Sequence, residues 1–382
     1  MKYLSFLNLS NVDNINCDSG YIFQTQLGNS LIELGHNYTL VIPIRLSNSL
    51  IEYKFHNFGT NKFQVRFSFD WNKIADLIKE VKPDIIISNQ PELSANLKAT
   101  LLSENINSKL YTYVHYYPFS ILPSGNIVFD PSLNNDGFCE SIIFSFVAGL
   151  LASDKIFVHS KYGEYLLNFL INRHNVQLNK REIIILPPPF DSYISQGNQI
   201  GTDNTILYNH RLYKQYGTEF LIDFANTISS HFDWKILVTD LLYNRNRNRK
   251  NLDKTVDKYK ADLSMLSNVE IRIDGNDREI YRNIICSSRI SLAPYRQNCT
   301  WSMSVVDCMS VGVPVVAPNF AWFSEFIPHE LLFNSLDELI KISKQLFRDK
   351  IFYKDMSTTV KALILSNERL DSYKSALLLT RL

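Results

Sequence analysis

The chain has 382 residues, a formal net charge of +1 and a 45% share of hydrophobic residues. This length fits two domains better than one, and the hydrophobic share suffices for a core in each. A net charge near zero excludes a global field that attracts polyanions, so contacts with nucleic acid would have to be local. The five cysteines are scattered and form no C-x-x-C pair. They predict a reducing, cytoplasmic setting without a disulfide framework or a structural zinc site.

Two apolar runs bear on membrane association. The run at 3–7 is short and lacks a small-residue cleavage site, so it predicts a first strand and not a signal peptide. The longest run, 141–152, is shorter than the roughly 20 residues that cross a bilayer. A buried helix is the preferred interpretation of this run, and an interfacial helix is less favoured because no basic face accompanies it. We therefore expect no transmembrane segment.

The first half of the chain alternates strand and helix patterns, which predicts a parallel α/β layer. The predicted strands are 3–7, 38–43, 83–88, 110–114, 152–160 and 183–186, with a further strand region in 44–70 around 63–67. The predicted helices are 21–34, 71–81, 93–102, 140–151 and 161–170. A stiff connector containing three prolines, 187–191, then leads into a polar linker, which marks a domain boundary.

Two residues of the first half are candidates for a site. Gly20 ends the loop before the first helix, where a glycine lets the backbone approach a ligand closely. A turn that begins a helix, with Asp18 or Ser19 as its cap, explains this glycine equally well. His115 follows a predicted parallel strand, and side chains at that end of a strand face the ligand crevice of open α/β sheets. A hydrogen-bonded core histidine is the alternative.

The second half repeats the alternation. We expect strands at 205–208, 235–239, 269–273, 290–293 and 313–316, and helices at 219–229, 278–287, 303–310, 336–347 and 354–382. Arg211 and Lys214 follow the first of these strands, where they could bind phosphate, although a solvated basic turn accounts for Lys214 as well. The basic run 244–250 is typical of a solvated loop and less often of a phosphate-backbone contact.

The segment 291–325 reads as strand, loop, helix, strand and loop, so both of its loops should lie at the ligand-binding edge of a sheet. Gly312 ends the helix, because glycine tolerates the left-handed C-terminal position. Asp307 stands among apolar residues of that helix, and an acid in such a place is either close to a ligand or costly. Glu325 is either a ligand or a surface acid.

This segment resembles the donor-site signature of the family 4-like glycosyltransferases (glycosyl transferases group 1). Their signature reads "PS…E…EAMA.G.PVVA……E", and the match consists of Pro294, the run 307–317 and Glu325. Further matches are Arg211 and Gly217, where the family reads "GR……KG", and the run 152–160. The resemblance implies the α/β GT-B fold, in which two Rossmann-like domains face each other across a cleft. It implies an acceptor domain at 1–190, a nucleotide-sugar domain at 191–360 and a helix, 361–382, that returns to the first domain.

The resemblance also implies roles for the residues of the donor site. Arg211 matches the arginine that clamps the donor diphosphate, and Lys214 would replace the expected lysine, whose place Tyr216 occupies. Asp307 matches the acid that holds the ribose hydroxyls. Cys299 stands at the position of the family's first acid, which normally contacts the sugar. Asn298, Thr300 or backbone amides of that loop would make this contact instead. Gly20, His115 and Glu325 are the other candidates for contact with the sugar nucleotide.

The expected activity is hexosyl or pentosyl transfer from a UDP- or GDP-sugar, retaining and without a metal. Residues 206–211 and 145–166 resemble the tRNA-queuosine mannosyltransferases, and phage enzymes that glycosylate DNA bases share the architecture. The composition, which is rich in Asn, Ile, Lys and Tyr, suggests an AT-rich genome, such as that of a phage or a low-GC bacterium. Tyr111, Tyr113, Tyr116 and Tyr117 could stack on a flipped base of DNA or tRNA, or they are core residues. A saccharide or lipid acceptor, a nucleotide-sugar epimerase and a non-catalytic nucleotide-sugar sensor are the alternatives, and the oligomeric state stays open.

Overall fold

The computed structural model describes residues 1–9, 15, 18–46, 50–57, 69–122, 124–129, 138–178, 182–199, 204–239, 255–272 and 277–382. The predicted strand at 63–67, the basic run 244–250 and Cys17 lie outside these residues. The chain forms two compact units, which are described separately below. Unit 1 contains Met1–Pro189 and Asp371–Leu382, and unit 2 contains Phe190–Leu370.

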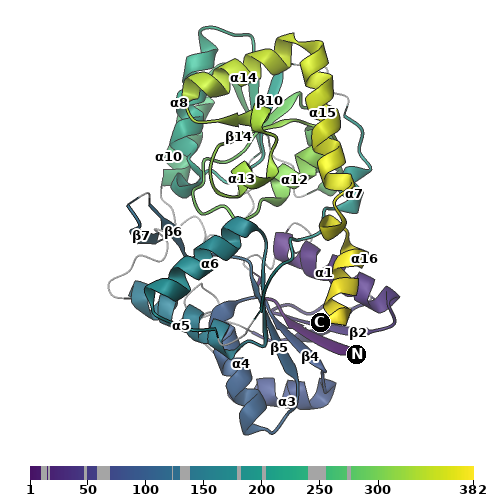
Figure 1. The fold of residues 1–382 in the computed structure, drawn as a ribbon. Coiled ribbons are helices and arrows are strands. Elements are labelled where there is room, and N and C mark those ends of the chain that lie inside the picture. The colour runs from purple at the N-terminus through teal and green to yellow at the C-terminus, as the bar shows by residue number, and fades with distance from the viewer. Residues whose placement is uncertain are drawn as a thin grey trace. The chain divides into compact units, whose positions relative to one another are not determined.

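Unit 1 is built on a parallel sheet that, within the described residues, has seven strands in the order β3-β2-β1-β4-β5-β8-β9 (Figure 1). Its strands are β1 (Lys2–Phe6), β2 (Asn37–Ile42), β3 (Glu52–Phe55), β4 (Ile85–Ser88), β5 (Lys109–Val114), β8 (Lys155–Val158) and β9 (Glu182–Ile185). Its helices are α1 (Ser19–Glu33), α3 (Trp71–Val81), α4 (Pro91–Ser103), α5 (Phe138–Ala152), α6 (Lys161–Arg173) and α16 (Ser372–Arg381). An antiparallel pair that the sequence did not reveal, β6 (Phe119–Ile121) and β7 (Ile127–Phe129), follows β5.

The side chains of the central strands alternate between two separate cores. Tyr3 of β1 packs into a cluster with α1, whereas its neighbour Leu4 packs into a cluster with α3 and α4. Ile87 and Ile86 of β4 divide between the same two clusters. Because helices cover both faces, these strands are continuously apolar instead of alternating with polar residues. The alternation of strands and helices from which the parallel layer was predicted places helices on both faces in this way.

Unit 2 repeats the design with a parallel sheet in the order β12-β11-β10-β13-β14-β15, again counted over the described residues. Its strands are β10 (Thr205–Tyr208), β11 (Lys235–Thr239), β12 (Val269–Arg272), β13 (Ile290–Leu292), β14 (Val315–Pro318) and β15 (Leu332–Phe333). Its helices are α7 (Ser192–Ser195), α8 (Thr218–Ser229), α10 (Thr255–Ser264), α11 (Arg278–Ser287), α12 (Met303–Ser310), α13 (Ala321–Phe326), α14 (Leu336–Arg348) and α15 (Lys350–Leu365). Gly312 has φ = +90° just after α12, as its predicted role at the helix end requires. The predicted α/β class with two Rossmann-like domains is confirmed.

The end of the chain differs from the prediction of one helix over 354–382. The helix α15 ends at Leu365, a short 3-10 turn covers Glu368–Leu370, and α16 starts at Ser372. Asp371 caps α16 by accepting a hydrogen bond from the backbone N–H of Lys374 at 2.9 Å. Helical periodicity continues through this break, which explains the wrong prediction, because the periodicity does not register a capping aspartate. The α16 helix belongs to unit 1, where Ser372 Oγ lies 3.1 Å from Ser30 Oγ of α1.

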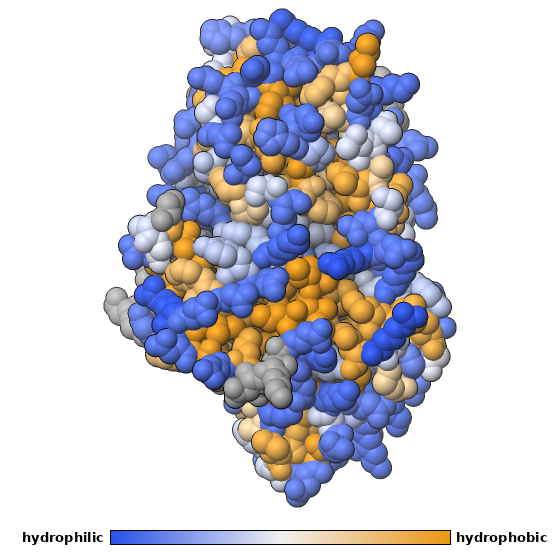
Figure 2. Space-filling model, in the orientation of Figure 1, coloured by the Kyte–Doolittle hydropathy of each residue, from blue (hydrophilic) through white to orange (hydrophobic). Residues whose placement is uncertain are grey.

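Hydrophilic residues cover much of the face seen in Figure 2, and the larger hydrophobic patches on that face belong to unit 1. The apolar run predicted as a buried helix is α5, which buries Ile142, Phe146 and Leu150 but leaves Phe144 61% exposed. Among the described residues, none of the helices combines the length and the apolar character needed to cross a membrane.

Gly149 of α5 allows this helix to touch α4 and provides a test of the packing. A Cβ atom placed on Gly149 would lie 1.7 Å from the carbonyl oxygen of Pro91. We expect Gly149→Ala to lower the free energy of unfolding by about 1–3 kcal/mol, since overpacking outweighs the better helix propensity of alanine. Urea unfolding measures the change.

Gly163→Ala in α6 is the matched control, because a Cβ atom there meets no atom closer than 3.4 Å. This variant should be as stable as the wild type or slightly more stable. Equal stability of the two variants would contradict the proposed contact between α4 and α5.

Candidate functional site

Polar side chains follow three neighbouring strands of the unit 1 sheet. Asn89 follows β4, His115 follows β5 and His159 follows β8, and these strands are adjacent in the sheet. Since carboxyl ends of parallel strands share one edge, the three side chains come together. The Nε2 atom of His115 lies 2.7 Å from Oδ1 of Asn89, and its Nδ1 atom lies 3.1 Å from Nε2 of His159.

The hydrogen bonds of Asn89 fix the protons of this chain of side chains. Asn89 donates through Nδ2 to Oγ of Ser5 at 2.9 Å and to the carbonyl of Phe6 at 3.0 Å, and a carbonyl can only accept. Its Oδ1 atom therefore accepts, from Nε2 of Gln24 at 2.8 Å and from Nε2 of His115. His115 must then carry its proton on Nε2 when neutral, and its Nδ1 accepts from Nε2–H of His159.

The surroundings keep both histidines neutral. Burial lowers the pKa of His115 to about 3 and the pKa of His159 well below its ordinary value. The ring of Tyr113 stacks on His115 at 4.7 Å between centroids, and Phe23 meets the same ring edge-on. His115 is thus at the predicted edge of the sheet with both ring nitrogens in internal hydrogen bonds. Its catalytic role stays a prediction.

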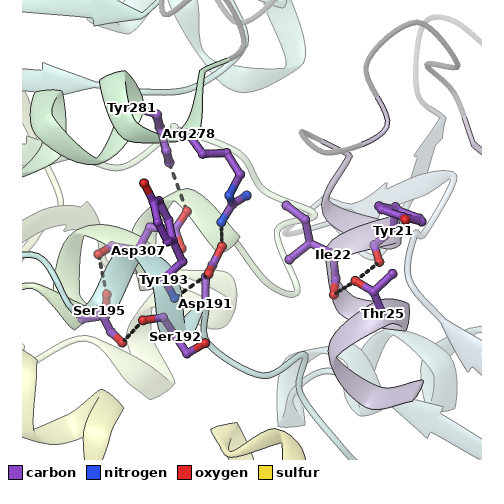
Figure 3. A network of polar contacts seen from close by, with 11 residues as sticks. Tyr21, Ile22, Thr25, Asp191, Ser192, Tyr193, Ser195, Arg278, Tyr281 and Asp307 are labelled. Atoms are coloured by element: carbon purple, nitrogen blue, oxygen red, sulfur yellow. Dashed lines mark hydrogen bonds and ion pairs between the residues drawn. The ribbon is translucent and has the colours of Figure 1, made fainter. Parts of the chain in front are cut away.

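Gly20 is the second residue of α1, where Asp18 is the cap. The N–H groups of Gly20 and Tyr21 donate to Oδ1 of Asp18 at 2.9 and 3.2 Å. Further along the helix, the hydroxyl of Thr25 donates to the carbonyls of Tyr21 and Ile22 (Figure 3). The cap thus uses the N–H of Gly20, as in the alternative explanation from the sequence.

In unit 2 a buried polar cluster lies at the end of β10. Tyr281 of α11 donates through its hydroxyl to Oδ2 of Asp307 on α12 at 3.1 Å (Figure 3). Asn209 donates through Nδ2 to the hydroxyl of Tyr281 at 3.0 Å and to the carbonyl of Ser304 at 3.3 Å. These contacts tie the end of β10 to both helices.

The buried atoms of this edge that have no hydrogen-bond partner among the described residues include Oδ1 of Asp307, Oδ1 of Asn209 and Nε2 of His210. Asp307 is only 8% exposed, and burial raises the pKa of its carboxyl to about 7, against the lowering effects of Tyr281 and Arg278. Buried polar atoms in folded proteins almost always have partners. Oδ1 of Asp307 can therefore accept a further hydrogen bond, and the role of Asp307 in binding a ribose stays a prediction.

The two predicted phosphate-binding residues both lie just after β10. Arg211 is half-buried, and no carboxylate pairs with it in the part of the chain that the structure describes. Lys214 is exposed at the start of the 3-10 turn Lys214–Tyr216, with Nζ 4.0 Å from the carboxylate of Glu219. Arg211 is consequently the better shielded cation of the pair.

The loop between β13 and α12 holds three more predicted residues, Asn298, Cys299 and Thr300, all of them buried. Asn298 accepts a hydrogen bond through Oδ1 from Nε of Arg296 at 2.7 Å. Burial raises the pKa of the Cys299 thiol to about 11, so the thiol stays protonated and cannot replace a carboxylate. Glu325 is exposed on α13, which follows β14 at the same edge of the sheet.

Sequence reasoning missed several polar residues of these edges. Asn89 and His159 follow buried strands as His115 does, so the argument applied to His115 would have found them. Asn209 directly precedes His210 in the run after β10, but Tyr281 lies in a helix and carries no signal of its own. The ion pair between Arg278 of α11 and the buried carboxylate of Asp191 was also missed (Figure 3).

Three of the four predicted stacking tyrosines are core residues. Tyr111, Tyr113 and Tyr117 are at most 1% exposed and belong to the hydrophobic clusters of unit 1. Tyr116 is half-buried. The alternative left open by the sequence, that aromatic strand residues are core, therefore holds for these three.

No protein-family model and no curated protein matches the chain. Solved structures do match it along almost its whole length. A glycosyltransferase from Rickettsia africae ESF-5 has 16% identity and a TM-score of 0.67, covering 99% of this chain and 97% of its own. Anabaena Alr3699/HepE in complex with UDP-glucose has 11% identity and a TM-score of 0.68, and the match covers 100% of this chain and 98% of the HepE chain.

Sucrose-phosphate synthase from Thermosynechococcus elongatus gives 12% identity and a TM-score of 0.73, covering 100% of this chain and 98% of its own. These structures have the GT-B fold, and the likeness establishes that fold for this chain.

The two neutral histidines of unit 1 predict a dependence of stability on pH. Their pKa values are lower in the folded than in the unfolded chain, so the unfolded chain binds protons first as the pH falls below about 6.5. Stability should therefore fall between pH 6.5 and 5, by up to about 1.4 kcal/mol per pH unit for each histidine.

His115→Gln tests this prediction, because a glutamine amide can still donate to Asn89 and accept from His159. The variant should lose less stability than the wild type between pH 7 and pH 5 in urea unfolding. An equal loss in both proteins would show that His115 is not held neutral.

Proposed function

We propose that this protein is a glycosyltransferase that moves a sugar from a nucleotide-sugar donor to an acceptor hydroxyl. The observation that carries the proposal is the buried carboxyl of Asp307, whose Oδ1 has no hydrogen-bond partner among the described residues. Asp307 lies at the same edge of the sheet as Arg211. A carboxylate accepts from two adjacent hydroxyls of a ribose, and an arginine fork binds a diphosphate. The fold supports this proposal, since the similar structures include glycosyltransferases.

The donor that the comparisons favour is a UDP-sugar. Among the similar structures, Alr3699/HepE is seen with UDP, with UDP-glucose, and with UDP and glucose. A GDP-sugar is the second possibility that the sequence left open. In both cases Asp307 would hold the ribose, and the loop with Asn298 and Thr300 would lie beside the sugar.

The chemical step breaks the bond between the anomeric carbon and the diphosphate oxygen, and a new bond forms to the acceptor oxygen. The acceptor's proton passes to the leaving phosphate, as the retaining route of the resembled family implies. Negative charge develops on the diphosphate, so Arg211 and Lys214 stabilise the transition state more than the ground state. We propose that these cations serve in place of a metal.

For the acceptor we propose a saccharide, in line with the similar structures of sucrose-phosphate synthase and the lipopolysaccharide outer core galactosyltransferase WaaB. A modified nucleobase of DNA or tRNA is the second candidate. It rests on residues 206–211 and 145–166, which resemble the tRNA-queuosine mannosyltransferases. Mass spectrometry of DNA, tRNA and glycans from cells that express the protein separates the two, because a hexose or pentose is added to one pool alone.

Arg211→Ala tests the role of the guanidinium. We expect turnover of the donor sugar nucleotide to fall about 100-fold or more, since removal of one charge-stabilising donor has effects of this size. Arg272→Ala is the matched control: this arginine ends β12 on the same sheet but is exposed and hydrogen-bonded to Glu270. Wild-type protein that binds UDP-sugars without any turnover would instead be a sensor, and conversion of the sugar without transfer would indicate an epimerase.

The raised pKa of Asp307 predicts that nucleoside binding depends on pH. The ionised carboxylate accepts two hydrogen bonds. The ionised fraction of Asp307 rises as the pH increases through about 7. Uridine, which lacks phosphate, should bind more tightly at pH 8 than at pH 6 in a calorimetric titration. Asp307→Asn should bind uridine weakly and with little change over this range, and an identical pH profile in both proteins would refute the assignment of Asp307 to the ribose.

A further inference from the structure

A second guanidinium lies at the end of β10, although it comes from a distant part of the chain. Arg296, in the loop after β13, donates through NH1 to the hydroxyl of Tyr216 at 3.0 Å and through Nε to Oδ1 of Asn298. Its guanidinium carbon lies 4.9 Å from the centre of the Tyr216 ring. Tyr216 ends the 3-10 turn that begins with Lys214, so Arg296 reaches the turn that carries the proposed diphosphate residues.

The backbone of Gly217 makes this approach possible. Gly217 has φ = +70°, and a Cβ atom there would lie 2.5 Å from Cβ and 2.8 Å from the carbonyl oxygen of Tyr295. Only glycine allows the loop with Tyr295 to rest directly on this turn. The ring of Tyr295 stacks on Phe220 of α8 at 4.8 Å, which holds the loop in place beside Arg296.

The neighbouring residues fix the orientation of the Arg296 guanidinium group. The two hydrogen-bond acceptors described above, Tyr216 and Asn298, are neutral groups, and both contacts hold the guanidinium plane in place. The same charge helps burial to hold the pKa of His210 at about 3, which places Arg296 within electrostatic reach of the residue before Arg211. Nε2 of His210 is a buried atom with no partner among the described residues, so this spot is polar and prepared for a ligand.

A nucleoside diphosphate carries more than one negative charge, and a single half-buried arginine balances only part of it. We propose that Arg296 supplies the second positive charge that binds the donor diphosphate, held in position by Tyr216. The proposal rests on the proposed function. Lys214 is exposed and lies close to Glu219, whereas Arg211 and Arg296 are both half-buried.

The test compares the binding of UDP with the binding of uridine in the full-length protein. Arg296→Ala should weaken UDP binding at least about tenfold, because charge-assisted hydrogen bonds are lost, and should leave uridine binding within about twofold. Tyr216→Phe should weaken UDP binding by less and again leave uridine unaffected. Adding Tyr216→Lys to Arg296→Ala should restore part of the UDP affinity, since it returns a cation to the same place.

Arg289→Ala is the matched control. Arg289 also stacks over a tyrosine, Tyr353, with 3.4 Å to the ring centroid, but it precedes β13 at the other edge of the sheet. Its removal should leave the ratio of UDP to uridine affinity unchanged. The ratio is taken within each variant, so a loss of folded protein affects both ligands alike.

Equal effects of Arg296→Ala on UDP and uridine, or no effect on either, would overturn the inference and leave Arg296 as a link between two loops. A wild-type protein that binds neither ligand would overturn the proposed function itself. The two failures are therefore distinguishable in one set of titrations.

Discussion

The need to satisfy buried polar groups determines how the side chains at the carboxyl edge of each sheet are arranged. Both units place polar side chains directly after apolar parallel strands. In the folded protein these side chains are largely buried away from water. In unit 1, Asn89 and His115 satisfy each other and fix the positions of their protons. In unit 2, Asp307 and His210 each keep a buried atom without a partner among the described residues. The constraint is thus met by internal hydrogen bonds around His115, whereas Asp307 and His210 are the candidates for contact with a ligand.

The fold was predictable because its signals are local and repeated. Short apolar runs alternate with helical patterns, and Gly312 ends a helix where the sequence suggests. The secondary-structure prediction failed where a strand was too short to give a pattern, and where one helical pattern ran across the boundary between two helices. The pair β6 and β7 consists of very short strands, and the helical pattern over 354–382 runs through the break before α16 without interruption.

The candidate site was predictable only in part. Asp307 could be found because an acid among apolar neighbours is unusual, and Arg211 because it follows a strand. Tyr281 and Arg296 could not be found in this way, since each reaches its partner across a large distance in the sequence. Their contacts depend on helix packing and on the close approach that Gly217 allows, and no pattern in a single segment encodes either of these.

The division of unit 1 between the two ends of the chain has a consequence for biosynthesis. Ala376 and Leu379 of α16 are buried in the cluster that also contains Phe23, Leu27 and Leu31 of α1. During translation, the apolar surface of α1 that α16 covers stays exposed until α16 has left the ribosome, after the whole of unit 2 has been made. Unit 1 therefore completes its folding only after unit 2 has been made, although domains generally fold in the order of their synthesis. Premature termination just before α16 would expose an apolar surface on α1 and favour aggregation of the truncated product.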